Sequence, residues 1–369
     1  MSGALPFATM RLRPLQLLPL ALCACAAGPA SAGDATACRS IVDDHARLAC
    51  YDAAVERAPA APAAPAMPVA PAPPVPPGET PGPSGRIAPP QAPIDGSADR
   101  SMIGERWSRY DARSPYPFLV RLHNANYVIL RHSDRVDGAP VSPTHPDAGA
   151  DTGIERDELK FQVSFKARLW ESEDLGVATW LGYTQQSNWQ MFNSLQSRPF
   201  RETDYQPELM FVMQPDMPLV GDLRWQILNV GFVHQSNGRA DPLSRSWNRV
   251  YAQFGVEDDH FAGGRLALLL RPWLRVHESA SRDDNPDITD YLGYGDVTLL
   301  WRHGRQVLTL IGRGNPATGK GAVQLDWSAP AVGPFRFYLQ VFTGYGESLI
   351  DYNFRQTVIG AGFALNDLL

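Results

Sequence analysis

The C-terminal two thirds of the chain alternate between apolar and polar residues with a period of two. In the clearest run, every second residue from Leu159 to Leu169 is apolar, while those between them, such as Lys160 and Lys166, are polar or charged. Successive side chains of a strand point to opposite faces, so the run predicts a strand with one apolar face. Ten segments have this β-like character: 159–169, 176–190, 223–236, 247–257, 265–277, 296–302, 306–313, 322–328, 335–343 and 357–366.

The predicted strands are separated by turn-forming pairs such as Gly263-Gly264 and Gly333-Pro334. Roughly 255 residues arranged as strands of about ten residues with turns correspond to about twelve strands. Eight of the nine tryptophans lie between Trp170 and Trp327, often near predicted strand ends, as in the aromatic girdle of a membrane barrel. We therefore predict an all-β fold, a transmembrane antiparallel β-barrel. A soluble β-sandwich, which also alternates, is the alternative.

The N-terminal third has a different composition and predicts three further segments. An apolar run at 15–27 follows Arg11 and Arg13 and leads to a small-residue site that ends at Ala32, which predicts a signal peptide over 1–32. A buried helix, or a lipoprotein anchored at Cys25, is the alternative. Residues 33–56 are predicted to form a small periplasmic leader. Residues 57–109, rich in Pro and Ala, are predicted to be a disordered, extended linker before a barrel over 110–369.

The cysteine content and the net charge limit the cellular compartments and the binding partners that are expected for this chain. Cleavage after Ala32 leaves Cys38 and Cys50, and an even pair in an exported chain predicts a disulfide rather than a metal site. The formal net charge of −6, without a basic block, gives no reason to expect nucleic acid as a partner. An exported barrel with no apolar helical span belongs in the outer membrane of a Gram-negative bacterium.

Three polar residues fall on strand faces that are otherwise apolar. His234 and Ser236 share a face with Val230 and Phe232, although the alternation breaks down below residue 228. Asn248 likewise shares its face with the apolar residues that follow it on the next predicted strand. A lipid-facing wall is a costly place for polar groups. A Ser–His–Asn catalytic group would explain them, because the Asn orients the His that deprotonates the Ser. The spacing alone favours an ordinary polar pair at a strand end.

The strings around these residues resemble the signature of the outer membrane phospholipase A family. The resemblance covers residues 115–369 in order and is carried by the segments 199–203, 234–239, 244–249, 283–289 and 344–354. It implies a twelve-stranded barrel that hydrolyses 1-acyl and 2-acyl ester bonds of phospholipids and lysophospholipids. It also implies activation by Ca²⁺ and by formation of a homodimer in equilibrium with the monomer. Ser236 would be the nucleophile, His234 the general base and Asn248 the orienting residue.

The same resemblance supplies a calcium site and a dimer contact. It implies that calcium is held by the Arg239 carbonyl, the Ser244 hydroxyl and Asp284, with Asp241 as a further acidic contact and Ser197 contributed by the partner subunit. Gln185 lies on a predicted lipid-facing strand face, where a lone amide is costly unless a second subunit satisfies it. The alternative function is a non-catalytic outer-membrane barrel, either a porin or a structural protein.

Overall fold

The computed structural model describes residues 38, 40–56, 101–107, 119–147, 153–172 and 174–366. The chain divides into two compact units, one up to Gly82 and one from Pro83 onward. In the first unit, helix α1 (Asp44–Glu56) begins where the Asp43 carboxylate accepts a hydrogen bond from the backbone amide of Ala46, and a disulfide joins Cys38 to Cys50. The signal peptide predicted over 1–32 lies outside the described residues.

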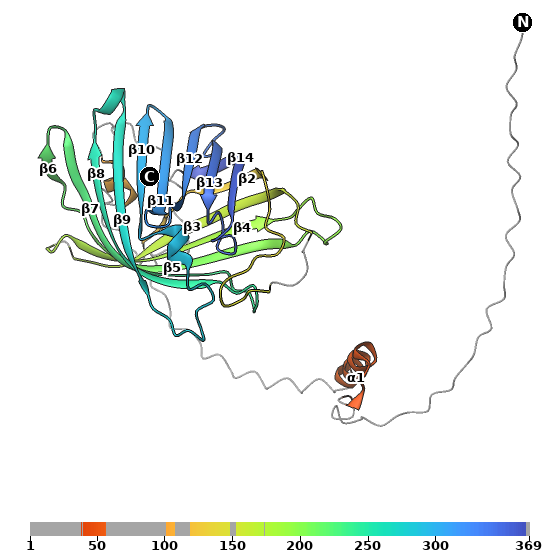
Figure 1. Cartoon of the computed structure of the whole chain (residues 1–369). Helices are drawn as coiled ribbons and strands as arrows, with labels where there is room; N and C mark the ends of the chain where they lie inside the picture. Colours follow the sequence, from red (N-terminus) through yellow and green to blue (C-terminus); the bar gives the residue numbers. More distant parts are fainter. Residues whose placement is uncertain are drawn as a thin grey trace, which may run out of the picture. The chain divides into compact units, whose positions relative to one another are not determined.

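The second unit is built from a single antiparallel sheet of fourteen strands (Figure 1). The strands are β1 (Leu119–Leu122), β2 (Asn126–Ser133), β3 (Asp157–Ser172), β4 (Val177–Trp189), β5 (Phe200–Met213), β6 (Met217–Val220), β7 (Leu223–Ser236), β8 (Ser246–Asp258), β9 (Arg265–Val276), β10 (Gly295–His303), β11 (Gln306–Asn315), β12 (Lys320–Pro330), β13 (Arg336–Tyr345) and β14 (Arg355–Asn366). The ten segments expected from the sequence are all strands, with ends within three residues of those predicted.

The sheet closes on itself, which confirms the predicted barrel and excludes the sandwich. Strand β14 pairs with β2, and β3 pairs with both β2 and β4, so the ring has no open edge. Strands β1 and β2 pair with successive parts of β3, and β5 and β6 with successive parts of β7. Each of these two pairs, β1 with β2 and β5 with β6, therefore counts as one interrupted strand of the barrel. The barrel wall has twelve strands when they are counted in this way. Among the described residues, no helix has the length and apolar character needed to cross a bilayer.

The two faces of the wall differ as the alternation predicted. Outward side chains are apolar and exposed, for example Val163 and Phe165 on β3 and Phe337 on β13. The inward neighbours Lys160 and Lys166 are buried. An apolar outer band around a polar interior is what a barrel in lipid requires, because lipid tails cannot solvate charges.

The end of the predicted linker is wrong, because the barrel unit begins well before residue 110. Residues 101–107 form a short segment with helix α2 (Met102–Arg106), whose Met102, Ile103 and Trp107 are buried inside the barrel. The Glu257 side chain on β8 accepts hydrogen bonds from the hydroxyl of Ser101 and from the backbone amides of Met102 and Ile103. The contacts that hold this segment come from residues about 155 positions away, and local composition does not reveal them.

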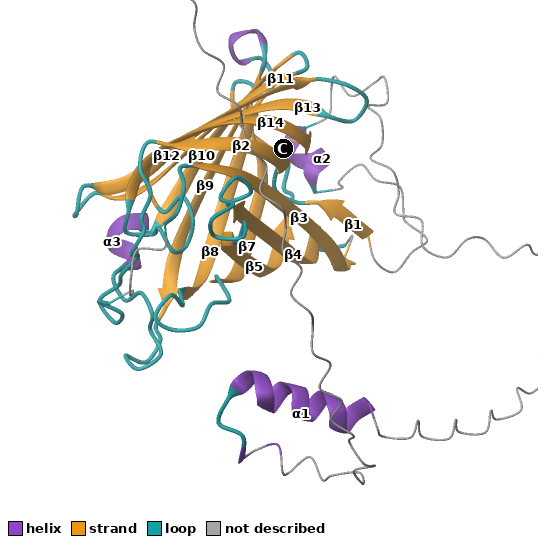
Figure 2. Ribbon diagram, turned by 90° about the vertical axis from the view of Figure 1, so that its right-hand side faces the viewer, coloured by secondary structure: helices purple, strands orange, loops and turns teal. Residues whose placement is uncertain are grey.

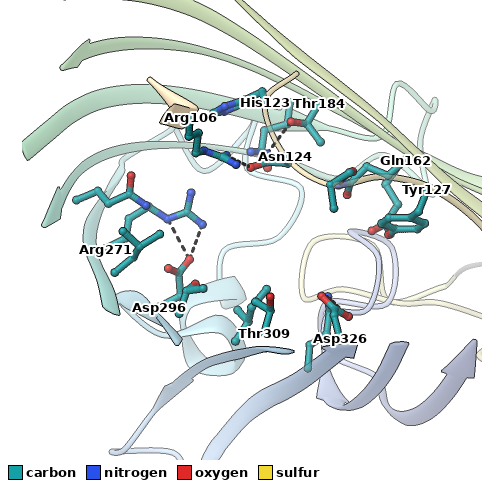
Figure 3. Close-up of a pocket in the computed structure, with 18 of the residues that line it drawn as sticks. Arg106, His123, Asn124, Tyr127, Gln162, Thr184, Arg271, Asp296, Thr309 and Asp326 are labelled. Atoms are coloured by element: carbon teal, nitrogen blue, oxygen red, sulfur yellow. Dashed lines mark hydrogen bonds and ion pairs between the residues drawn. The ribbon is translucent and has the colours of Figure 1, made fainter. Parts of the chain in front are cut away.

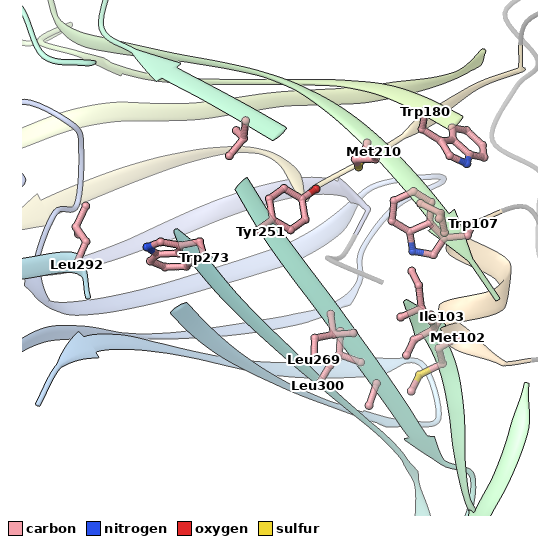
Figure 4. Close-up of a cluster of buried hydrophobic side chains, with 14 of the residues drawn as sticks. Met102, Ile103, Trp107, Trp180, Met210, Tyr251, Leu269, Trp273, Leu292 and Leu300 are labelled. Carbon is pink, nitrogen blue, oxygen red and sulfur yellow. The ribbon is translucent and has the colours of Figure 1, made fainter. Parts of the chain in front are cut away.

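Three of the eight tryptophans that the sequence suggested for an outer girdle lie inside the barrel, whereas Trp170, near the end of β3, is 53 % exposed. Trp107, Trp180 and Trp273 lie inside the barrel in a cluster with Met210 and Leu269 (Figure 4). Trp247 belongs to the same buried cluster. Two of these rings face buried cations: the Lys166 ammonium lies 3.4 Å from the ring centroid of Trp107, and the Arg249 guanidinium carbon lies 3.9 Å from that of Trp247. A ring face attracts a cation where water is excluded, so the tryptophans help to stabilise charge inside the lumen.

Within the described part of the barrel, largely polar side chains line two cavities of 240 and 180 Å³. In the larger cavity, Arg271 forms an ion pair with Asp296, and the Nη2 of Arg106 donates a hydrogen bond to Asn124 (Figure 3). Figure 2 shows α2 at one end of the barrel and α3 (Ile288–Leu292) at the other. Both cavities are lined by inward-facing residues and neither includes His234, Ser236 or Asn248.

Glu347, in the loop between β13 and β14, joins a buried group of cations. Its carboxylate lies 2.9 Å from Lys160 Nζ, 3.4 Å from Arg131 Nη1 and 3.6 Å from Arg201 Nη2, and all these side chains are buried. Burial alone would raise the pKa of Glu347, but the charges of Arg131, Lys160 and Arg201 hold it well below its usual range. The stabilisation that this pairing gives is therefore complete at neutral pH and lost only in strong acid.

Replacing Glu347 by alanine is expected to lower the stability of the barrel by about 3–5 kcal/mol, because it leaves buried cations uncompensated. The measurement is the temperature at which the folded band converts to the unfolded band on a gel run without boiling. The control, Glu171→Ala, breaks a half-exposed pair with Arg168 and should change the stability by about 1 kcal/mol or less. Equal transition temperatures for the two variants would contradict the role given to Glu347.

Candidate active site

The predicted catalytic residues lie at the end of β7 and the start of β8, on the outer wall. His234 and Asn248 are directly opposite each other in the β7–β8 register. Phe232, two positions before His234, is 45 % exposed, and Val250, two positions after Asn248, is 43 % exposed. Val233, which lies between Phe232 and His234 on β7, is 3 % exposed and faces the lumen. The predicted face is therefore the observed one for all three residues, since Ser236 is two positions beyond His234 on the same strand.

A register shift explains why the alternation of β7 breaks down below residue 228. The β7–β8 pairing slips between Trp225 and Ile227, so that Gln226, which regular alternation would place outward, is 2 % exposed beside the inward-facing Ile227. A β-bulge adds one residue to one strand and reverses the faces of everything beyond it. The polar residues at the far end of β7 are unaffected, because they lie on the regular side of the bulge.

The His234 and Asn248 side chains form a hydrogen bond 2.9 Å long, between Nδ1 and Oδ1. An amide oxygen can only accept, so the imidazole carries its proton on Nδ1 and its Nε2 is left as the basic nitrogen. Ser236 is half-buried, and no hydrogen bond joins its hydroxyl to His234 within the part of the chain that the structure describes. Such contacts are commonly long before substrate binds.

The loop between β7 and β8 is organised by Asn237, whose side chain is buried. Its Oδ1 accepts from the backbone amides of Arg239 and Arg245, and its Nδ2 donates to the Leu243 carbonyl. This one side chain thus ties together the loop that carries both Arg239 and Ser244. Asn237 lies in the segment 234–239 that carries the family resemblance. Its structural role depends on the folded conformation of the loop, which the sequence alone does not give.

The predicted calcium residues are brought together only in part. The Ser244 hydroxyl donates to Asp284 Oδ2 at 2.6 Å, and Asp241 and Asp284 gather around His145, whose Nε2 lies 3.7 and 3.4 Å from their Oδ1 atoms. Ligand atoms of these three titratable residues lie within 4.8 Å of one another. Sequence analysis missed His145, which comes from the β2–β3 loop, more than ninety residues away in sequence from either carboxylate.

The side chains of Arg239 and Ser197 are not part of this cluster. The Arg239 guanidinium donates to the Arg201 carbonyl on β5 and pairs with Glu202 at 3.3 Å. Ser197 is exposed in the β4–β5 loop, with a φ of 58°. A cluster of carboxylates and a hydroxyl fits calcium, which prefers oxygen ligands, whereas the imidazole nitrogen of His145 suits softer metals.

Gln185 lies on β4, but its amide is not as isolated as the sequence suggested. Its Oε1 accepts from the Tyr183 hydroxyl at 3.0 Å, and its Nε2 donates to the Ser187 hydroxyl at 3.3 Å. These same-strand partners lower the cost of an amide on the outer wall, so that cost alone does not require a second subunit. The remaining N–H of the amide can still donate across an interface.

Comparisons with known proteins agree with this architecture. The family model described as phospholipase A1 matches residues 103–365. A Neisseria meningitidis relative is 45% identical over 261 residues, which cover 68% of this chain and 66% of that protein. The phospholipase A1 of Salmonella typhimurium is 40% identical over 256 residues, covering 68% of this chain and 83% of that protein.

Two solved structures are similar over the whole barrel. An active-site asparagine-to-alanine mutant of outer membrane phospholipase A from Escherichia coli gives a TM-score of 0.64 at 35% identity, covering 73% of this chain and all of that one. The calcium-bound dimer of the Salmonella typhi outer membrane phospholipase gives 0.64 at 34% identity, covering 73% and 98%. With a closed barrel and the family match over residues 103–365, the chain belongs to the phospholipase A1 family and is an outer-membrane β-barrel phospholipase of a Gram-negative bacterium.

Proposed function

We propose that this protein is a calcium-dependent phospholipase that hydrolyses the 1-acyl and 2-acyl ester bonds of phospholipids, and those of lysophospholipids, on the lipid-facing side of the barrel. The observation that carries the proposal is the His234–Asn248 hydrogen bond on an outward, otherwise apolar face. A porin or structural barrel has no use for such a pair there. The active-site asparagine named for the E. coli structure is consistent with this assignment.

In the proposed mechanism Ser236 is the nucleophile and His234 the general base. The Ser236 hydroxyl attacks the ester carbonyl while His234 Nε2 accepts its proton. The imidazolium, held through Nδ1 by Asn248, then returns the proton to the departing lysophospholipid oxygen. Water attacks the acyl-enzyme in the same way, with His234 again as base, and releases the fatty acid. Because the residues lie on the outer wall, the ester is reached from the membrane without a pore.

Ca²⁺ fits the oxygen donors near this group. We propose that Ser244 and Asp284 hold it, with Asp241 as a further acidic contact, the Arg239 backbone carbonyl as a ligand and Ser197 supplied by a second subunit. When bound, the ion polarises the ester carbonyl and stabilises the developing oxyanion. The calcium-bound dimer of the S. typhi relative supports this, although its ligands are those of that protein. The active form would then be a homodimer in equilibrium with the monomer.

A dimer contact at Gln185 can be tested by cross-linking. A Gln185→Cys variant treated with a short thiol-reactive cross-linker is expected to give a covalent dimer in calcium and little of it after chelation. Leu339→Cys on β13, which is outward and 45 % exposed but on a distant part of the wall, is the control and should give little dimer in either condition. Equal cross-linking at both positions, or dimer that persists without calcium, would contradict a calcium-dependent interface at β4.

A further inference from the structure

Asn248 has a second partner besides His234, and this partner is charged. Its Nδ2 donates a hydrogen bond of 2.9 Å to Glu278 Oε1. The strand register explains the alignment: His234 on β7 pairs with Asn248 on β8, and Asn248 pairs with Val276 at the end of β9. Glu278 follows Val276 by two positions, so the three side chains form a row across three neighbouring strands on the outer wall.

The contact with Glu278 can fix the orientation of the Asn248 amide, because the two ends of an amide differ in their hydrogen-bonding chemistry. The oxygen and nitrogen ends of an Asn side chain are almost the same size, and packing alone hardly distinguishes them. His234 needs the oxygen end, because only an acceptor fixes its proton on Nδ1. A carboxylate has no proton to donate and therefore accepts only from the NH₂ end. Glu278 thus selects the one amide orientation in which Oδ1 faces the imidazole.

We propose that Glu278 is a positioning residue that acts through Asn248, holding the amide in the orientation that the catalytic histidine requires. Its negative charge also polarises the amide, which strengthens the hydrogen bond that Oδ1 accepts from His234. The row is Ser236, His234, Asn248 and Glu278, in which Asn248 stands between Glu278 and the imidazole. The inference rests on the proposed Ser–His–Asn function.

The test measures kcat and KM on phospholipid–detergent micelles with calcium, for the full-length enzyme. Glu278→Gln can offer either a donor or an acceptor to Asn248, so the amide loses its fixed orientation. We expect kcat to fall by about tenfold with KM unchanged, since a hydrogen bond to a charged group is lost from the catalytic row. Glu171→Gln, an exposed glutamate on β3, is the control and should retain wild-type kinetics. Folding of each variant is checked by its heat-dependent gel shift.

Two further backgrounds separate positioning from a structural role. In Asn248→Ala there is no amide to orient, so adding Glu278→Gln should cause no further loss. In Asn248→Asp the carboxylate accepts from His234 in either orientation and repels Glu278, so adding Glu278→Gln should leave kcat unchanged or raise it. The same tenfold loss in all backgrounds would overturn the proposal. Wild-type activity of Asn248→Ala alone would instead overturn the catalytic role of Asn248, and the positioning role with it.

Discussion

Replacing Ser236 by alanine is expected to reduce phospholipid hydrolysis by about 10³-fold or more while the barrel still folds. The hydroxyl oxygen is the nucleophile that forms the acyl-enzyme in the proposed mechanism, and without it the acyl transfer that water later completes cannot begin. The side chain is half-buried at the end of β7 and makes no hydrogen bond to another described side chain, so its loss should not disturb the strand. Initial rates on phospholipid–detergent micelles with calcium give the measurement.

The matched control for this experiment is Ser281→Ala. Ser281 is exposed in the loop that follows β9, outside the row formed by His234 and Asn248, and its variant should hydrolyse phospholipid at the wild-type rate. A heat-dependent gel shift like that of the wild type shows that the Ser236→Ala barrel is folded. Wild-type-like hydrolysis by a folded Ser236→Ala variant would remove Ser236 as the nucleophile.

Removing calcium is expected to reduce activity by about 10²–10³-fold, the usual cost of losing one stabilising group for the oxyanion. Chelation should do this to the wild type, and Asp284→Ala should do it at calcium concentrations that saturate the wild type. The Asp284 carboxylate accepts from Ser244 and lies beside Asp241 and His145, so its loss takes an anionic oxygen from the centre of the cluster. Calcium titrations of hydrolysis and of equilibrium binding give the two measurements.

Asp174→Ala is the control for the calcium experiment, because Asp174 is an exposed acid in the turn between β3 and β4. Its calcium dependence should be that of the wild type. The Asp284→Ala variant should regain activity when calcium is raised well above the level that saturates the wild type, because other oxygen donors remain. Full activity of the wild type after complete chelation would exclude a calcium-dependent mechanism.

The alternation of apolar and polar residues predicted the strands in which it is regular, and it missed strands in which it is not. Strand β5 was not predicted, because its first half carries Arg201, Glu202 and Asp204 and its middle carries Pro207, which normally argues against a strand. In the structure these charges are satisfied from other segments: Arg201 donates to Glu158 and to Asp351, and the Leu349 amide donates to Asp204. A segment with low strand propensity can therefore form a strand when residues from other segments pair with its buried charges.

The position of α2 could not be predicted for a related reason. Its five residues follow a long Pro/Ala-rich stretch, and only Met102, Ile103 and Trp107 hint at burial. The segment is held by the Glu257 side chain and by the inner surface of a barrel that forms only when β14 meets β2. A short helix has little stability alone, so its structure is decided by what it packs against.

In the strands with regular alternation, the sequence by itself determined which residues face lipid, because successive side chains of a strand point to opposite faces. That placed His234, Ser236 and Asn248 on the outer wall. Only the tertiary structure decided which of them meet, because register is a relation between strands: it set His234 opposite Asn248 and brought Glu278 to the amide. It also decided that His145 joins Asp241 and Asp284, since loops far apart in sequence converge only when the barrel closes.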